Sequence, residues 1–255
     1  MESQILLSPK LKIGRADEHI NSLKVTLAAF LKTGFYRLHV EKDPNDGSNK
    51  LRFEVTDSMP RDVPLIIGDA VHNLRAALDL TVYEMISLAG ATPTKWLRFP
   101  FRDTRDELIA VLNGAEINIA GPWLIDLIVN KIKPYKGGDT LLCALHDLDI
   151  LDKHRLLIPT LSITKLAGVN AMSGGIVFKS ISFTVSQNGR INFLSSGADI
   201  EITDYGQPSF NILFDKGQIL EGYPLFPTLH RLSQLVSDIV QAIEEGYWAN
   251  KKSTK

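Results

Sequence analysis

The chain has 255 residues, of which 44% are hydrophobic and 22% charged, a balance typical of a globular protein and not of a disordered or fibrous one. Its 28 Lys and Arg residues nearly balance its 29 Asp and Glu residues, and the formal net charge of -1 excludes the basic field on which strong general nucleic-acid binding depends. A single cysteine excludes an internal disulfide framework. The sequence contains no run of about 18 apolar residues, the length that would predict a membrane span.

The N-terminal segment MESQILLSPKLKIGR has no basic start followed by a continuous apolar region, so it does not resemble a secretory signal. We therefore expect a cytoplasmic protein. The lone Cys143 lies between Leu142 and Ala144 in an apolar run. Free cysteines in such runs are usually buried, so the pattern predicts a side chain that fills the core and not a nucleophile.

The N-terminal part of the chain predicts a helix followed by a β-hairpin. Residues 15–34 are amphipathic, with apolar side chains that recur at helical spacing on one face. Segments 36–42 and 50–57 alternate apolar and polar residues on either side of the turn sequence DPNDGS. This alternation around a turn is typical of a β-hairpin.

A long apolar segment, 62–90, predicts the central helix of the fold. Asp62 is a good N-cap and Gly90 a natural stop, which gives a helix of about seven turns. Its polar side chains line up on one side: His72, Arg75, Asp79 and Tyr83. Because this stripe contains no lysine and is mixed with apolar residues, we expect neighbouring elements to cover the helix on most sides.

Two shorter helices are predicted next, over residues 104–112 and 122–132. Thr104 followed by Glu107 forms a capping box, in which each residue satisfies a backbone amide of the other. Pro122 suits the first turn of the second helix.

A further helix is predicted over residues 140–155, with leucines on its apolar face. Polar residues at spacings of three and four fall on one side of it: His146, Asp149 and Lys153.

Asp152 falls inside the apolar arc of this helix. Burial of an unpaired charge is very costly, so this carboxyl group must be either paired or protonated. Arg155 is its nearest candidate partner, and His72 or Arg75 of the long helix are the alternatives.

After Arg155 the period of the apolar pattern changes from helical to alternating. Several runs between residues 155 and 217 are typical of β-strands, and Asn188-Gly189 between two of them predicts a hairpin turn. The chain closes with an amphipathic helix over residues 227–248.

These elements predict an α+β protein with a bundle-like helical lobe, an N-terminal β-hairpin, a C-terminal antiparallel sheet and a returning C-terminal helix. We expect one domain over residues 1–255. Its expected lobes are a mainly helical one over 1–154, a β lobe over 155–224, and a helix over 225–250 that packs back.

The two helices with polar stripes also carry recognisable motifs. The segments are G-D-x-x-H-N-L-R-x-x-L-D at 68–79 and D-K-H-R at 152–155, with FPF at 99–101 and KPY at 133–135 between them. Over roughly residues 60–160 the chain resembles a widespread group of bacterial proteins without an established activity. The resemblance implies that the two motifs work as one unit. It departs from the group at Leu80, where many members have a histidine.

We expect the two helices to face each other, so that their ionisable side chains share one groove. The candidate catalytic residues are His72, Arg75, Asp79, His146, Asp152, Lys153, His154 and Arg155, with Asp149 beside them. Histidine transfers protons near neutral pH, arginine and lysine stabilise developing negative charge, and aspartate orients histidine. This combination suits either hydrolysis of a phosphoester or acyl bond, or capture of an anion.

A structural role explains the same residues. Asp79, Asp152, Arg75 and Arg155 form, in this alternative, a buried ion-pair network that holds the two helices together, with the histidines as its hydrogen-bond partners. A metal site is a narrower option, with His146 and Asp149 as ligands together with Asp152 or His154. The cations that flank His154 make a poor setting for a divalent metal, so we expect no metal and no cofactor.

The sequence therefore leads to two hypotheses of different classes. The first is a hydrolase for an anionic or ester-like small-molecule substrate, with His72 or His154 as acid or base. In it Asp79 or Asp152 orients the histidine, and Arg75, Lys153 or Arg155 holds negative charge. The second is a non-catalytic ligand-binding or interaction module whose charged network is structural.

Overall fold

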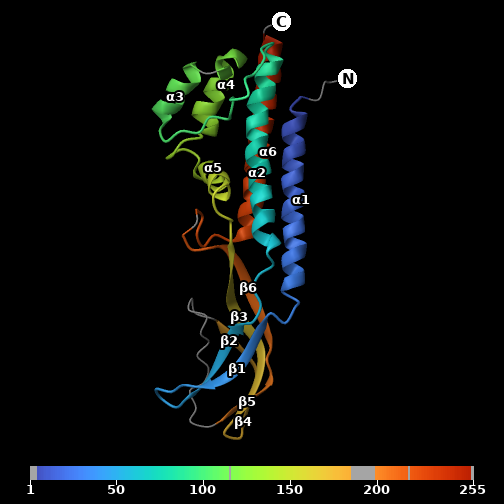
Figure 1. Cartoon of the computed structure of the whole chain (residues 1–255), viewed down its shortest axis with the longest axis vertical. Coiled ribbons are helices and arrows are strands. Elements are labelled where there is room, and N and C mark those ends of the chain that lie inside the picture. The colour runs from blue at the N-terminus through green and yellow to red at the C-terminus, as the bar shows by residue number, and fades with distance from the viewer. Residues whose placement is uncertain (1–4, 115, 185–198, 218, 254–255) are drawn as a thin grey trace.

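A computed structural model describes residues 5–114, 116–184, 199–217 and 219–253, and it shows an elongated α+β protein (Figure 1). Its helices are α1 (Leu7–Phe30), α2 (Asp62–Leu88), α3 (Arg105–Gly114), η1 (Glu116–Ala120), α4 (Pro122–Asp126), η2 (Leu127–Ile132), α5 (Thr140–Asp152) and α6 (Leu225–Ser253). Its strands are β1 (Tyr36–Lys42), β2 (Asn49–Val55), β3 (Pro159–Ser173), β4 (Ile176–Thr184), β5 (Ile200–Asp204) and β6 (Gln207–Phe214). The predicted fold class is confirmed.

Helix α2 lies at the centre of the helical part. The long helices α1 and α6 run alongside it, and α5 lies on the opposite side from α1 (Figure 1). Side chains from most of the circumference of α2 are buried, including Leu74, Leu78 and Ile86, each fully shielded from solvent, and one stripe of the helix stays exposed. Only a helix that is packed on most sides needs apolar residues around so much of its circumference. The prediction that α2 is covered by neighbouring elements is therefore confirmed.

Strand β3 is the central strand of the C-terminal sheet, because each of the other three strands pairs with it. It pairs antiparallel with β4 along Lys165–Ser173, with β6 along its first half, and with β5 near its end. Gly206, at φ 65°, makes the turn between β5 and β6, where a side chain would collide with the Ala167 carbonyl. The predicted antiparallel sheet is confirmed, whereas the predicted turn at Asn188-Gly189 lies outside the described residues.

The hairpin formed by β1 and β2 lies beside this sheet and not beside the bundle (Figure 1). The rings of Phe35 and Tyr36 lie 5.2 and 5.9 Å from the ring of Phe210 in β6. Aromatic contacts at these separations stabilise packing beyond the area they bury. The hairpin thus extends the β part, although the chain reaches it before the central helix.

Several helix ends follow the predicted signals. Thr104 Oγ1 accepts a hydrogen bond from the Glu107 amide at 3.2 Å, and Glu107 Oε2 accepts one from the Thr104 amide at 3.2 Å, which confirms the capping box. Helix α1, in contrast, begins at Leu7 and not at residue 15. Pro9 fits in the first turn of this helix because backbone amides there have no intrahelical hydrogen-bond acceptor. The amide hydrogen that proline lacks therefore costs no hydrogen bond.

Within the described ranges, no helix is both long and apolar enough to cross a lipid bilayer.

Candidate functional site

Helices α2 and α5 contact each other along the side of the bundle, and the segment 99–101 passes between them. The N-terminus of α5 is set by Asp139, whose Oδ1 atom accepts a hydrogen bond from the Leu142 amide at 2.8 Å. This start orients the polar residues of α5 towards α2. Two separate groups of side chains result, one around Arg75 and one around His72.

The first group, which we call the Arg75 network, consists of Arg75, Asp79 and His146 with Phe99 and Phe101. Arg75 donates from Nη1 to Asp79 Oδ1 at 2.5 Å, from Nη2 to the Phe99 carbonyl at 3.2 Å, and from Nε to His146 Nδ1 at 3.3 Å. Its side chain is only 8% exposed. Each of the three guanidinium nitrogens therefore has a partner within the protein.

Asp79 and Phe101 complete the network. Asp79 Oδ1 also accepts the Phe99 amide at 2.7 Å, which ties the 99–101 segment to α2 by both its amide and its carbonyl. The Phe101 ring stacks on the His146 ring, with centroids 4.3 Å apart and planes 8° from parallel. Arg75 Cζ lies 4.7 Å from the centre of the Phe101 ring, a distance at which the cation attracts the aromatic face.

His146 is held in one protonation state by these contacts. Its Nδ1 atom accepts the hydrogen bond from Arg75, so the proton of the neutral ring resides on Nε2. Burial lowers the pKa of His146, and the positive charge of Arg75 lowers it further. The imidazole is therefore neutral at pH 7 and presents a hydrogen-bond donor, not a free base.

The second group, the His72 cluster, consists of His72, Asp149 and Lys153. His72 Nδ1 lies 3.0 Å from Asp149 Oδ1, and Lys153 donates from Nζ to Asp149 Oδ2 at 2.6 Å. The Asp149 side chain is 5% exposed, whereas the side chains of His72 and Lys153 are 59% and 56% exposed. A buried carboxylate thus orients an exposed imidazole.

Asp152 packs directly against α2 at Gly68. A Cβ atom on Gly68 would collide with both carboxylate oxygens of Asp152, so a side chain at this position of the first motif would displace that carboxylate. Burial raises the pKa of Asp152, and the nearby charges of Asp149 and Asp69 raise it further. His72 and Lys153 offset part of this shift.

Of the partners predicted for Asp152, His72 lies close enough for its charge to lower the pKa of the carboxyl group. Arg155, Arg75 and His72 make no hydrogen bond or ion pair with it in the part of the chain that the structure describes.

His154 and Arg155 lie beyond the end of α5, where their amides bond to the Leu151 carbonyl and their side chains are exposed. Neither side chain makes a hydrogen bond or ion pair with the other candidates among the described residues. The predicted groove thus unites His72 with Lys153, and Arg75 with Asp79 and His146, but not the last two residues of the D-K-H-R motif.

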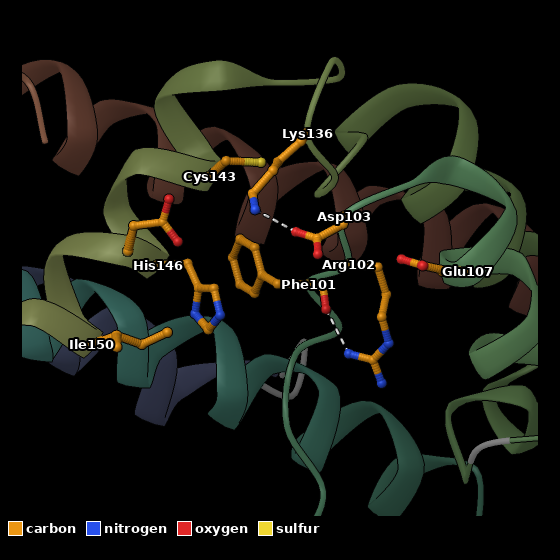
Figure 2. A pocket seen from close by; sticks show the side chains of 9 residues that line it. Phe101, Arg102, Asp103, Glu107, Lys136, Cys143, His146 and Ile150 are labelled. Atoms are coloured by element: carbon orange, nitrogen blue, oxygen red, sulfur yellow. Dashed lines mark hydrogen bonds and ion pairs between the residues drawn. The ribbon is translucent and has the colours of Figure 1, made fainter.

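A pocket of about 300 Å³ opens next to the Arg75 network, between α5 and the start of α3 (Figure 2). Its lining residues are Phe101, Arg102, Asp103, Glu107, Lys136, Cys143, His146, Asp147 and Ile150. Of these, sequence reasoning selected only His146. The parallel bridge between Arg102, which follows FPF, and Tyr135, the last residue of KPY, brings these two short motifs together, so they were the available signal.

The charges in this pocket are unevenly paired. Lys136 Nζ lies 2.5 Å from Asp103 Oδ1, and the hydrogen bond from that ammonium to Asp103 raises the pKa of Lys136 (Figure 2). Arg102 donates from Nη1 to the Phe101 carbonyl at 2.5 Å, and Glu107 is engaged in its capping box. Asp147, in contrast, forms no hydrogen bond or ion pair with any described residue, and its carboxylate is available to a ligand.

Cys143 lies on the wall of this pocket, so the prediction that it fills the core is wrong. Partial burial raises the pKa of its thiol, and the nearby carboxylates of Asp147 and Asp139 raise it further. A thiol with a raised pKa stays protonated at neutral pH and is a poor nucleophile.

No family model, curated protein or solved structure matches this chain. The resemblance to a group of bacterial proteins therefore stays a prediction. Among the described residues, no three His, Cys, Asp or Glu side chains are grouped so that they could hold a metal ion together.

Proposed function

We propose that the protein is a non-catalytic binding protein for a small ligand that carries a cationic amine, and that the ligand occupies the pocket between α3 and α5. The observation that carries this proposal is the unpaired carboxylate of Asp147 in a pocket whose two cations already have partners. Phe101, Ile150 and Cys143 offer apolar surface to the remainder of the ligand.

The groups of the pocket favour binding over chemistry. Arg75 is committed to three partners, His146 has its Nδ1 lone pair occupied, and the Cys143 thiol is protonated. A hydrolytic site needs a free base or an activated nucleophile within reach of the substrate. The Arg75 network instead supports the pocket wall by holding Phe101 against α5.

The charge balance favours a cation over an anion. Three carboxylates and two cations line the pocket, from Asp103, Glu107, Asp147, Arg102 and Lys136. An anionic ligand would meet Asp147 without a compensating free cation, whereas an amine would form a charge-assisted hydrogen bond to it. The proposed ligand therefore differs in sign from the anionic substrate expected from the sequence.

Asp147→Asn is expected to weaken the binding of phenethylamine about tenfold, because the charged partner of the ammonium is lost. Isothermal titration calorimetry measures this against two ligands of similar shape, 3-phenylpropionate and 2-phenylethanol, whose binding the substitution should not weaken. Asp106→Asn, an exposed position of α3 outside the pocket, is the matched control. Tighter binding of phenylpropionate than of phenethylamine to the wild type would contradict the proposal, as would equal amine affinity in both proteins.

A second candidate function is hydrolysis at the His72 cluster. Its specific support is the pairing of an exposed imidazole with a buried carboxylate, because Asp149 holds the proton on His72 Nδ1 and leaves Nε2 free to accept one. Lys153, bound to the same carboxylate, is the cation nearest to this base. Asp149 takes the orienting role that the sequence assigned to Asp79 or Asp152.

For this candidate, His72→Ala is expected to lower kcat by about 10²- to 10⁴-fold on 4-nitrophenyl acetate or bis(4-nitrophenyl) phosphate, with an unchanged melting temperature. His154→Ala is the control, since its side chain is exposed beyond the helix end and should leave turnover intact. Equal turnover in the wild type and the His72 variant would exclude the cluster as a hydrolytic site.

A further inference from the structure

A second cavity lies at the end of the bundle farthest from the sheet, where α2, α4 and α6 meet (Figure 1). It measures about 610 Å³, within the range of small-molecule sites. Met85, Leu88 and Ala89 come from the end of α2, Trp123 from α4, and Tyr247 and Lys251 from α6. The wall is thus aromatic and aliphatic apart from the polar groups that α6 supplies.

Trp123 is fixed in place as an apolar wall of this cavity. Gly246 of α6 leaves room for its ring: a Cβ atom there would lie only 2.7 Å from Trp123 Cζ3. The indole Nε1 atom donates to the Ala120 carbonyl at 2.8 Å, which satisfies its only polar group. The exposed face of the ring therefore offers apolar contact alone.

Lys251 gives the cavity a positive rim. Its ammonium lies 5.4 Å from the centre of the Tyr247 ring and 5.3 Å from that of Trp248. It also donates to the Tyr247 hydroxyl at 3.2 Å, which uses one of its three protons. None of the described residues that line this cavity carries a carboxylate. An ammonium held over two rings, next to an apolar wall and without an acidic competitor, complements an anionic group on an apolar body.

From this complementarity we infer that the cavity binds an amphipathic monocarboxylate with an aliphatic body, of the class of medium-chain fatty acids. The aliphatic chain lies against Met85, Leu88 and Trp123, and the carboxylate accepts a hydrogen bond from Lys251. The same chemistry occurs in free fatty acids and in anionic lipids, so the test distinguishes the two sources. This site is independent of the proposed amine pocket.

The test is calorimetric titration of the full chain with decanoate, decanol and decyltrimethylammonium. We expect decanoate to bind most tightly, and Lys251→Met to weaken it about tenfold while decanol is unaffected. Lys252→Met, which changes a neighbouring exposed lysine outside the cavity lining, should bind decanoate as the wild type does. Ala89→Trp, which fills the cavity, should abolish binding of both decanoate and decanol.

Co-sedimentation with phosphatidylglycerol vesicles separates the two sources. Saturable decanoate binding without vesicle association supports a free carboxylate as ligand, and vesicle association that Lys251→Met reduces supports a lipid. Decanoate binding that is insensitive to both Lys251→Met and Ala89→Trp would overturn the inference, as would the absence of saturable decanoate binding together with the absence of vesicle association.

Discussion

Arg75→Met is expected to lower the free energy of unfolding by about 3 kcal/mol. Methionine retains much of the apolar stem but removes every donor that the guanidinium group supplies, so Asp79, the Phe99 carbonyl and His146 each lose a partner. The loss is large because the guanidinium lies in a buried setting where water cannot replace it, with a side-chain exposure of 8%. Urea denaturation followed by circular dichroism measures the change.

Arg98→Met is the matched control for this experiment. Its Nε atom lies 3.9 Å from Asp79 Oδ2, but its side chain is 60% exposed. Surface ion pairs contribute about 0–1 kcal/mol, so this substitution should change the free energy of unfolding little. If Arg75→Met were also within about 1 kcal/mol of the wild type, the Arg75 network would not be what holds α2, α5 and the 99–101 segment together.

Phe101→Ala is expected to destabilise the protein by about 3–5 kcal/mol. The ring is 8% exposed and belongs to the hydrophobic core, so truncation leaves a cavity between α5 and α2. It also removes the stack on His146 and the aromatic partner of the Arg75 guanidinium. Chemical denaturation at pH 7 provides the measurement, and phenethylamine titration of the folded variant should show weakened binding.

Trp96→Ala, in the segment that precedes Phe99, is the control for Phe101→Ala. Trp96 is also aromatic but is 76% exposed, so its truncation should cost no more than about 0.5 kcal/mol. Because Phe101 and Arg75 contact each other, the double variant should lose less than the two single losses together. A Phe101 variant as stable as the Trp96 variant would refute the assigned packing role.

These stability experiments separate the two hypotheses that the sequence left open. A purely catalytic Arg75 would be dispensable for folding, whereas its commitment to three internal partners predicts the opposite. His72 differs, because its ring is 59% exposed and, when it is removed, the Asp149 carboxylate keeps its hydrogen bond from Lys153. Activity and stability should therefore respond to different residues of the same two helices.

Local signals were sufficient to predict most of the secondary structure. The Thr104 and Glu107 pair caps α3, and the alternating segments form β1 and β2. Each of these features depends on residues only a few positions apart, so the information lies in a short stretch of sequence. The pairing of one strand, β3, with three partners depends on contacts between distant residues, and no local pattern specified it.

The candidate site shows the same division. Helical spacing placed His72 and Arg75 on one stripe of α2, about 60° apart around the axis. That difference is enough for the packing of α5 and the 99–101 segment to enclose Arg75, at 8% exposure, and to leave His72 at 59%. The sequence could predict that these residues share a face, but not which of them the protein would keep from water.

By itself, the sequence determined the order and type of the long helices and of the hairpin, the central position of α2 and the list of ionisable residues in its motifs, whereas it did not predict the short helix Glu116–Ala120 or the change to a π-helix at Leu127–Ile132. The tertiary structure alone decided how those residues are partitioned: Arg75, Asp79 and His146 into a sequestered network, His72 and Asp149 into a pair of an exposed imidazole and a buried carboxylate, and Asp147 onto the wall of a pocket. The physical reason is the separation along the sequence of the residues that determine each feature. Periodicity and caps are encoded within a few residues, whereas burial, hydrogen-bond partners and pKa shifts arise from segments that meet only after the chain has folded.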